Sequence, residues 1–248
     1  MKIILEHLNK KYSCDLSKGI DLSSTLAKVG GEIKAWYVND SEAKPVKNDD
    51  WIGSVEQGSS VNFFNIFFNP HGNGTHTEGF GHISKAQESV NDQVKEYHFI
   101  AHYISVEPIE VKTDHIISWD LIKDKVENWD FDALIIKAGH FKSGHDFSNT
   151  NPPYFDADCI LKIREKGIKH ILTDLPSVDR EEDAGQLLSH KAWWNFPENP
   201  RSEATISELL EIEEGIEEGL YFMNLQLAPF HNDATPSRPV LYKLNEIF

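Results

Sequence analysis

The 248-residue chain has little cysteine and no long apolar run. Its two cysteines, Cys14 and Cys159, form no Cys-x-x-Cys pair, which argues against a thiolate zinc site or a redox motif. No apolar run approaches the roughly 20 residues that cross a bilayer. The run Ile3–Leu5 is also shorter than the apolar region of a secretory signal, which has about 7–15 residues. We therefore expect a cytoplasmic protein in a reducing compartment.

Basic residues are also scarce, with 24 Lys and Arg against 40 Asp and Glu and a net charge of −16. This balance argues against nucleic acid, which is bound by a basic surface, and against an anionic membrane. Apolar residues make up 40% and charged residues 26%, as in ordinary globular proteins. The length fits one large domain or two small ones, and we expect a single domain over residues 1–248.

The apolar pattern predicts strands in the first half of the chain. These strands are expected at Ile33–Val38, Val61–Phe68, His98–Val106 and Leu134–Lys137. The second of them, VNFFNIFF, is apolar on both faces, so we expect it in the centre of a sheet.

The second half is predicted to mix helices and strands. Residues 156–166 have near-helical apolar spacing and end at Gly167, which fits a helix C-terminus. Thr205 and Glu208 have the spacing of a capping box, which predicts a helix over 205–214. Strands are expected at 169–173, 219–227 and 239–244, and a long surface loop at 142–153. The sum predicts a mixed α/β fold.

One short segment contains several residues that can bind a metal or take part in catalysis. The stretch 71–82, HGNGTHTEGFGH, contains three histidines and a glutamate between four glycines. Imidazole and carboxylate together suit zinc, manganese or iron. In an extended segment His76, Glu78 and His82 share a face, whereas His71 joins them only if the chain bulges at 72–74.

This segment resembles the signature of the cyclase family of metal-dependent hydrolases, which includes kynurenine formamidase (arylformamidase). The family pattern is His-x-Gly-Thr-His-x-Asp-x-Pro-x-His, and this chain has Gly74-Thr75-His76, then Glu78 and His82. Weaker similarities follow in the family's order over residues 20–244. They are Asp21–Ser23, Trp36, Ala138-Gly139 with His140 in place of a tryptophan, Thr173–Asp179, His190, Glu208 and Pro236–Pro239.

The resemblance implies a swivelling β/β/α domain whose central, partly closed mixed sheet is flanked by helices. It also implies a homodimer or homotetramer, and one or two divalent ions, zinc or manganese. The implied ligands are His71, His76, Glu78, His190 and Glu208. His82 is the implied general acid–base residue or a ligand of the second ion, and Trp36 and Arg238 are implied to bind substrate.

Purely structural alternatives to these roles also remain. The first two histidines are five residues apart instead of four, and Glu78 replaces an aspartate. Either the chain bulges so that His71 still coordinates, or Gly72 takes that place and the site loses a ligand. His190 can be a helix-terminus histidine, Glu208 a capping residue and Arg238 a salt-bridge partner.

We therefore predict a metal-dependent hydrolase that cleaves the C–N bond of a small amide, formamide or cyclic amide. Two other hypotheses remain. One is an altered family member that only binds a small polar ligand. The other is a metal-dependent lyase or dehydratase.

Overall fold

The computed structural model describes residues 1–27, 31–139, 141 and 143–247. Its centre is a sheet that closes on itself, because the first and seventh strands in the order also pair with each other. Around the ring the strands are β16 (Gly219–Leu227), β9 (His98–Ser105), β12 (Ala133–Lys137), β14 (His170–Thr173), β15 (Thr205–Glu208), β8 (His76–Glu78) and β17 (Ala234–Lys243). A short strand, β3 (Ile20–Asp21), extends the sheet beside β17.

The ring combines parallel and antiparallel pairing. Strands β9, β12, β14 and β15 are parallel to one another, whereas β8, β17 and β16 close the ring through antiparallel pairs. Side chains alternate between the two faces of each strand. In β12, Leu134 and Ile136 therefore pack outward against helices, while Ala133 and Ile135 pack into the inner core.

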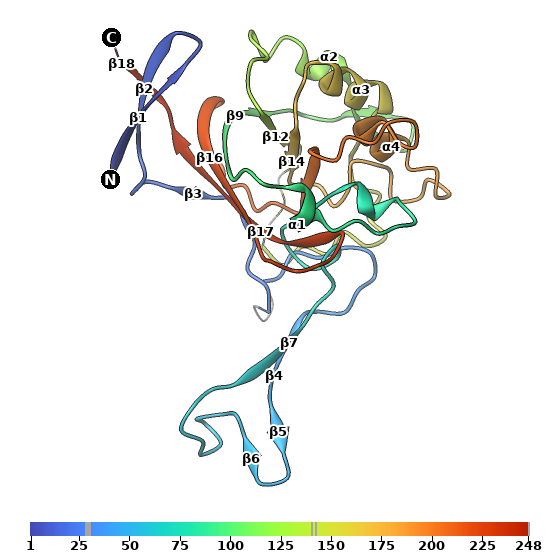
Figure 1. The fold of residues 1–248 in the computed structure, drawn as a ribbon. Helices are drawn as coiled ribbons and strands as arrows, with labels where there is room; N and C mark the ends of the chain where they lie inside the picture. Colours follow the sequence, from blue (N-terminus) through green and yellow to red (C-terminus); the bar gives the residue numbers. More distant parts are fainter. Residues whose placement is uncertain (28–30, 140, 142, 248) are drawn as a thin grey trace.

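The helices are short. Helices α2 (Trp119–Ile122), α3 (Ala157–Glu165) and α4 (Leu188–Trp194) lie together on one side of the closed sheet (Figure 1). Helix α1 (Val90–Gln93) and a 3₁₀ turn, η1 (Phe80–His82), lie in the connection between β8 and β9. Helix α3 begins where the Asp156 side chain accepts the amide of Asp158, and Gly167 follows it with φ +88°. No helix among the described residues is long and apolar enough to cross a membrane.

Four small sheets surround this core. One lies at the termini, where β1 (Lys2–His7) and β18 (Asn245–Ile247) flank β2 (Lys10–Asp15). Another contains β10 (Ile109–Val111), β11 (Asp114–Ile117) and β13 (Tyr154–Phe155). The last two are two-stranded ribbons, in which β4 (Glu42–Pro45) pairs with β7 (Phe64–Phe67) and β5 (Lys47–Asn48) with β6 (Trp51–Ile52).

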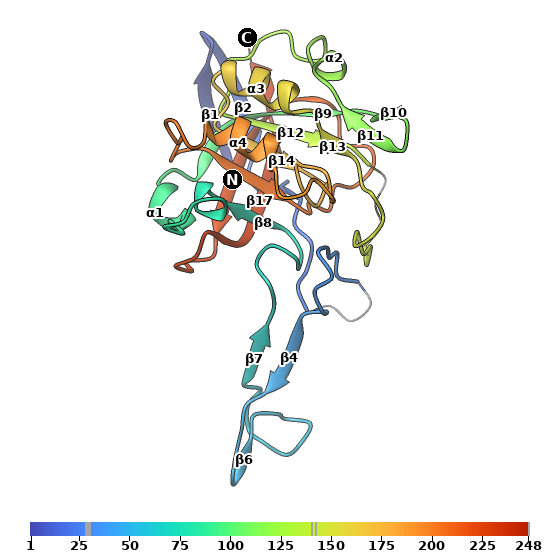
Figure 2. The ribbon, with the colours of Figure 1, turned by 90° about the vertical axis from the view of Figure 1, so that its right-hand side faces the viewer.

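The two ribbons form an arm, residues 42–68, that projects away from the closed sheet (Figures 1 and 2). The prediction that 61–68 is a central strand is therefore wrong. Only Phe64–Phe67 is a strand, and all four of its residues are exposed. The apolar pattern predicts burial within this chain, but the fold leaves both faces of the ribbon uncovered.

Two other predicted elements are also wrong. Residues 33–38 form no strand and make only isolated bridges through Lys34. Residues 205–208 are strand β15, and no helix follows them, so Glu208 is not a capping residue. The capping-box spacing was coincidental there, because pairing with β14 and β8 fixes an extended chain. The predicted elements at 98–106, 134–137, 156–166, 169–173 and 219–227 are confirmed within a few residues, and 239–244 lies largely in β17.

The mixed α/β fold with a partly closed, helix-flanked sheet is thus confirmed. A buried carboxyl links two strand ends in it. Asp174, directly after β14, accepts the amides of Ala138 and Gly139, directly after β12, at 2.8 and 3.0 Å. Burial raises the pKa of Asp174 to about 7, although these hydrogen bonds act in the opposite direction.

This pKa predicts how stability depends on pH. Between the unfolded pKa of about 3.9 and the folded pKa of about 7, only the folded state keeps the Asp174 proton. The stabilisation from this group is therefore complete below the lower value and is lost as pH rises through the higher one. We expect the unfolding free energy, measured by urea titration from pH 4 to 8, to fall more steeply for the native protein than for Asp174→Asn. Parallel curves would contradict this assignment.

Candidate metal centre

Strand β8 supplies the two innermost polar side chains of the site. His76 and Glu78 are two residues apart on an extended strand, so both point to one face, and both are fully buried. The Nδ1 atom of His76 lies 3.2 Å from the carbonyl oxygen of Gly74, which has φ +68°. This contact turns Nε2 of His76 toward the interior of the site.

The neighbouring strand and a helix add two more groups. Glu208 is the direct partner of His76 in the β15–β8 register, and its Oε2 lies 3.5 Å from Nε2 of His76. His190, on α4, places Nε2 3.2 Å from Oε1 of Glu78. Its other nitrogen, Nδ1, lies 2.6 Å from the carboxylate of Asp179.

His71 reaches the site from a turn, as expected for a bulged chain. The side-chain oxygen of Asn69 accepts the amides of His71 and Gly72, and the amide of Asn73 donates to the Asn69 carbonyl. The resulting turn places Nδ1 of His71 3.0 Å from Oε2 of Glu78. Its Nε2 lies 2.8 Å from Oδ2 of Asp233. The five-residue spacing therefore does not remove His71 from the site.

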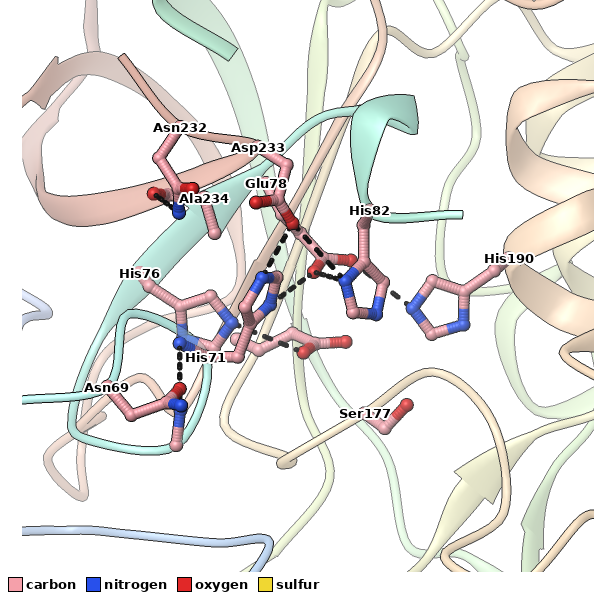
Figure 3. A network of polar contacts seen from close by, with 12 residues as sticks. Asn69, His71, His76, Glu78, His82, Ser177, His190, Asn232, Asp233 and Ala234 are labelled. Atoms are coloured by element: carbon pink, nitrogen blue, oxygen red, sulfur yellow. Dashed lines mark hydrogen bonds and ion pairs between the residues drawn. The ribbon is translucent and has the colours of Figure 1, made fainter. Parts of the chain in front are cut away.

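Three of the histidines share one arrangement, and two of them, His71 and His190, face the Glu78 carboxylate (Figure 3). For His71, His76 and His190, one ring nitrogen faces a glutamate and the other faces a protein acceptor. Histidine ligands of metal ions are commonly held in this way, because the outer acceptor fixes both tautomer and ring orientation.

The ligand atoms lie close enough for one or two ions. They converge within 4.8 Å in three groups, which are His71–His76–Glu78, Glu78–His82–His190 and His71–His82–Asp233. Glu78 belongs to the first two groups, so its two oxygens can face two ions.

Two buried atoms show that the residues fit a metal. Nε2 of His76 and Oε2 of Glu78 are buried without a hydrogen-bond partner, and Nδ1 of His71 approaches Oε2 of Glu78 to 3.0 Å. A buried polar atom without a partner costs about 1–3 kcal/mol, more when it is charged. A divalent cation between these atoms would satisfy both.

Protons on the histidines balance the negative charge of the neighbouring carboxylates. Burial disfavours the charged ring of His71, but the carboxylates of Asp233 and Glu78 outweigh it and raise the pKa of His71 to about 10. Burial is likewise outweighed at His190, where Asp179 and Glu78 raise the pKa to about 10. Burial acts to raise the pKa of Glu78, but His82, His190 and His71 hold it well below its usual range. Metal binding would release such protons.

His82 has the most exposed side chain of the four histidines. It ends the turn η1, and its side chain is 31% exposed. Its Nδ1 lies 3.8 Å from Oε2 of Glu78 and 3.5 Å from Oδ2 of Asp233. It therefore borders a cavity of about 360 Å³ that is also lined by Trp36, Glu78, His190 and Glu208.

The structure thus brings together all five predicted ligands with His82 and Trp36. Arg238 is not among them, because it forms an ion pair with Asp21 at 2.6 Å on the surface, where its side chain is 72% exposed. His140, interpreted as replacing a tryptophan, lies outside the described residues. Asp179 lies in the segment that resembles the family, but its role was not predicted. Asp233 carried no sequence signal, being 162 residues from His71.

Comparisons with known proteins identify the family. The family model described as "putative cyclase" matches residues 20–180, more than half of the chain. The protein therefore belongs to this cyclase family, as its sequence predicts. No curated protein matches it significantly.

Solved structures share the fold at low sequence identity. A potential metal-dependent hydrolase with cyclase activity has a TM-score of 0.59 and 16% identity, over 91% of this chain and 97% of the other. A predicted metal-dependent hydrolase from Bacillus stearothermophilus has a TM-score of 0.58 and 18% identity, over 91% of this chain and 98% of the other. An isatin hydrolase bound to the product analogue thioisatinate has a TM-score of 0.64 and 12% identity, over 92% of this chain and 93% of the other. The predicted class, metal-dependent hydrolase, agrees with the names of these proteins.

Proposed function

We propose that this protein is a metal-dependent hydrolase that cleaves the C–N bond of a small amide, of the aryl formamide or cyclic amide type. The observation that carries the proposal is the pair of buried, unpartnered atoms on His76 and Glu78 inside a ring of oriented imidazoles. Isatin hydrolase, which shares the fold, is named for a cyclic amide.

The chain's own residues would hold one or two ions. His71, His76 and Glu208 surround one side of Glu78, and His190 faces its other oxygen. This nitrogen- and oxygen-rich set suits zinc, with manganese as the alternative. A divalent ion would polarise the carbonyl of the substrate and lower the pKa of a bound water, to about 7 for zinc.

His82 is the group placed to move a proton. It is the most exposed histidine of the cluster, and it borders both the cavity and Glu78. We assign it to accept a proton from the attacking water and to donate one to the leaving nitrogen. A leaving amine needs that proton, because an amide anion is a poor leaving group.

The cavity supports a small substrate with an aromatic part. Its volume of about 360 Å³ is at the low end for ligand pockets. Trp36 lines it with φ +62°, a backbone conformation that costs a bulky residue of order 1–3 kcal/mol. The amide of the next residue, Tyr37, donates to Ser148 at 2.8 Å and helps to hold this conformation. We therefore assign Trp36 to pack against the substrate.

We further propose that the protein acts in the cytoplasm as a homodimer. Both cysteines are buried free thiols, as is usual in a reducing compartment. The arm exposes Phe63, Phe64, Ile66 and Phe67 by 41–58%, and consecutive residues of a strand lie on opposite faces. Such a ribbon needs cover on two sides, which a second copy provides when each arm packs against the other chain. Each side chain fully buried contributes about 1.5–3 kcal/mol.

Loss of an inner ligand should remove the metal. His76→Ala and Glu78→Ala are each expected to lower the zinc content, measured by plasma emission spectrometry after dialysis, because each removes a buried ligand atom. Glu78→Ala should affect every bound ion, since Glu78 belongs to two groups. A native protein that holds no zinc or manganese after incubation with either would contradict the proposed function.

Replacement of His82 should separate metal binding from turnover. We expect His82→Ala to keep its metal while turnover of an aryl formamide or of isatin falls by about 10²–10⁴-fold, the usual contribution of general acid–base catalysis. Unchanged turnover would remove His82 from the proton-transfer step. Loss of one ion per chain would instead identify it as a ligand.

The arm should control assembly. We expect the native protein to be a dimer by light scattering and the double variant Ile66→Ser/Phe67→Ser to be a monomer, because both faces of the ribbon lose apolar area. The matched control is Ile109→Ser/Val111→Ser, which changes two similarly exposed residues of strand β10. The same mass for the native protein and the arm variant would contradict the assignment of the interface.

A further inference from the structure

Asp233 touches two histidines that the proposed function gives different tasks (Figure 3). Its Oδ2 atom lies 2.8 Å from Nε2 of His71 and 3.5 Å from Nδ1 of His82. His71 is a proposed ligand, and His82 is the proposed proton carrier. Asp233 itself follows the turn between β16 and β17, far from both in sequence.

The backbone holds Asp233 in place independently of these contacts. Its carbonyl oxygen accepts the amide of Gly79 at 3.0 Å, directly after β8. The next residue, Ala234, pairs with Glu78 in the β17–β8 register. On the other side, the carbonyl oxygen of Asn232 accepts the amide of Val90 at 2.9 Å. The carboxylate is therefore presented from a fixed point of the sheet, next to Glu78.

His71 needs such support more than the other proposed ligands do. His76 lies on a central strand with a fully buried side chain, and His190 lies on a helix with a side chain only 3% exposed. His71 lies on a turn outside the regular elements, and its side chain is 22% exposed. Without a partner for Nε2, packing alone would have to orient its ring.

The histidine spacing explains why this support is required. The family pattern places the first histidine four residues before the second, at the position of Gly72 in this chain. A side chain at Gly72 has no space, because a Cβ there would lie 2.8 Å from both methyl groups of Val38. The first histidine consequently stands at position 71, one residue farther along the chain from His76 than in the family pattern.

We infer that Asp233 is a positioning residue that orients His71 for metal binding and so compensates for the five-residue spacing. It accepts the Nε2 proton of His71, which leaves Nδ1 unprotonated and directed at the ion beside Glu78. Asp179 has the equivalent task for His190, at 2.6 Å. This inference rests on the proposed function, because it assumes that a metal binds at Glu78.

The test measures zinc affinity by chelator competition at fixed pH, together with the number of ions per chain. Loss of an outer acceptor of a ligating histidine typically costs 10–100-fold in metal affinity. We expect Asp233→Ala to bind zinc 10–100-fold more weakly with the same stoichiometry. Asp233→Asn keeps an oxygen that accepts the Nε2 proton, so its affinity should lie between that of Asp233→Ala and the native value. A general loss of structure would not be rescued in this way.

The matched control is Asp92→Ala, which removes another aspartate that faces a histidine. Asp92 lies 3.5 Å from His231, but both side chains are exposed on the surface, so zinc affinity should not change. Equal affinity of Asp233→Ala and native protein would overturn the inference and leave the proposed function intact. Loss of one whole ion in Asp233→Ala would also overturn it, by making Asp233 a direct ligand. A native protein without metal affinity would refute the proposed function itself.

Discussion

The rest of the site depends on one buried carboxylate, that of Glu78. Removing an ion from water costs several kcal/mol even after the protein relaxes, so this charge requires compensation. The compensation comes from imidazoles on three separate segments, namely His71, His82 and His190 (Figure 3). Each of these rings has a second contact in the protein, so the arrangement is oriented before any ion arrives. A site organised in this way would bind a cation without reorganising.

The closed sheet brings these segments together. Strand β8 lies between β15 and β17, so one register places Glu208 opposite His76 and another places Ala234 opposite Glu78. Asp179, between β14 and α4, fixes His190 from the helical side. Residues more than 100 positions apart thereby meet within hydrogen-bond distance. The sheet determines the geometry of the site, whereas turn η1 and a loop supply His82 and Trp36, which border the cavity.

The sequence allowed the local part of this arrangement to be predicted. The even spacing of His76 and Glu78 placed both on one face of strand β8, and the family resemblance added His190 and Glu208. His82 joins them from turn η1, so the extended spacing does not account for its position. Asp233 could not be predicted, because strand register alone places it beside His71. The apolar pattern led to a wrong position for residues 61–68 for a related reason. Such a pattern indicates that a face is covered but does not identify what covers it. The helix expected at 205–214 failed because strand pairing on both sides overrides local capping signals.

The arm and the proposed metal site are adjacent along the chain. Strand β7 ends at Phe67, and His71 follows four residues later, after Asn69 closes the turn that carries it. Phe68, between them, contacts the ring of Phe230, close to the turn that precedes Asp233. His71, a proposed ligand, and Asp233, the carboxylate beside it, are thus both connected to the base of the arm. The proposed interface and the proposed metal site therefore share the two segments that meet at His71.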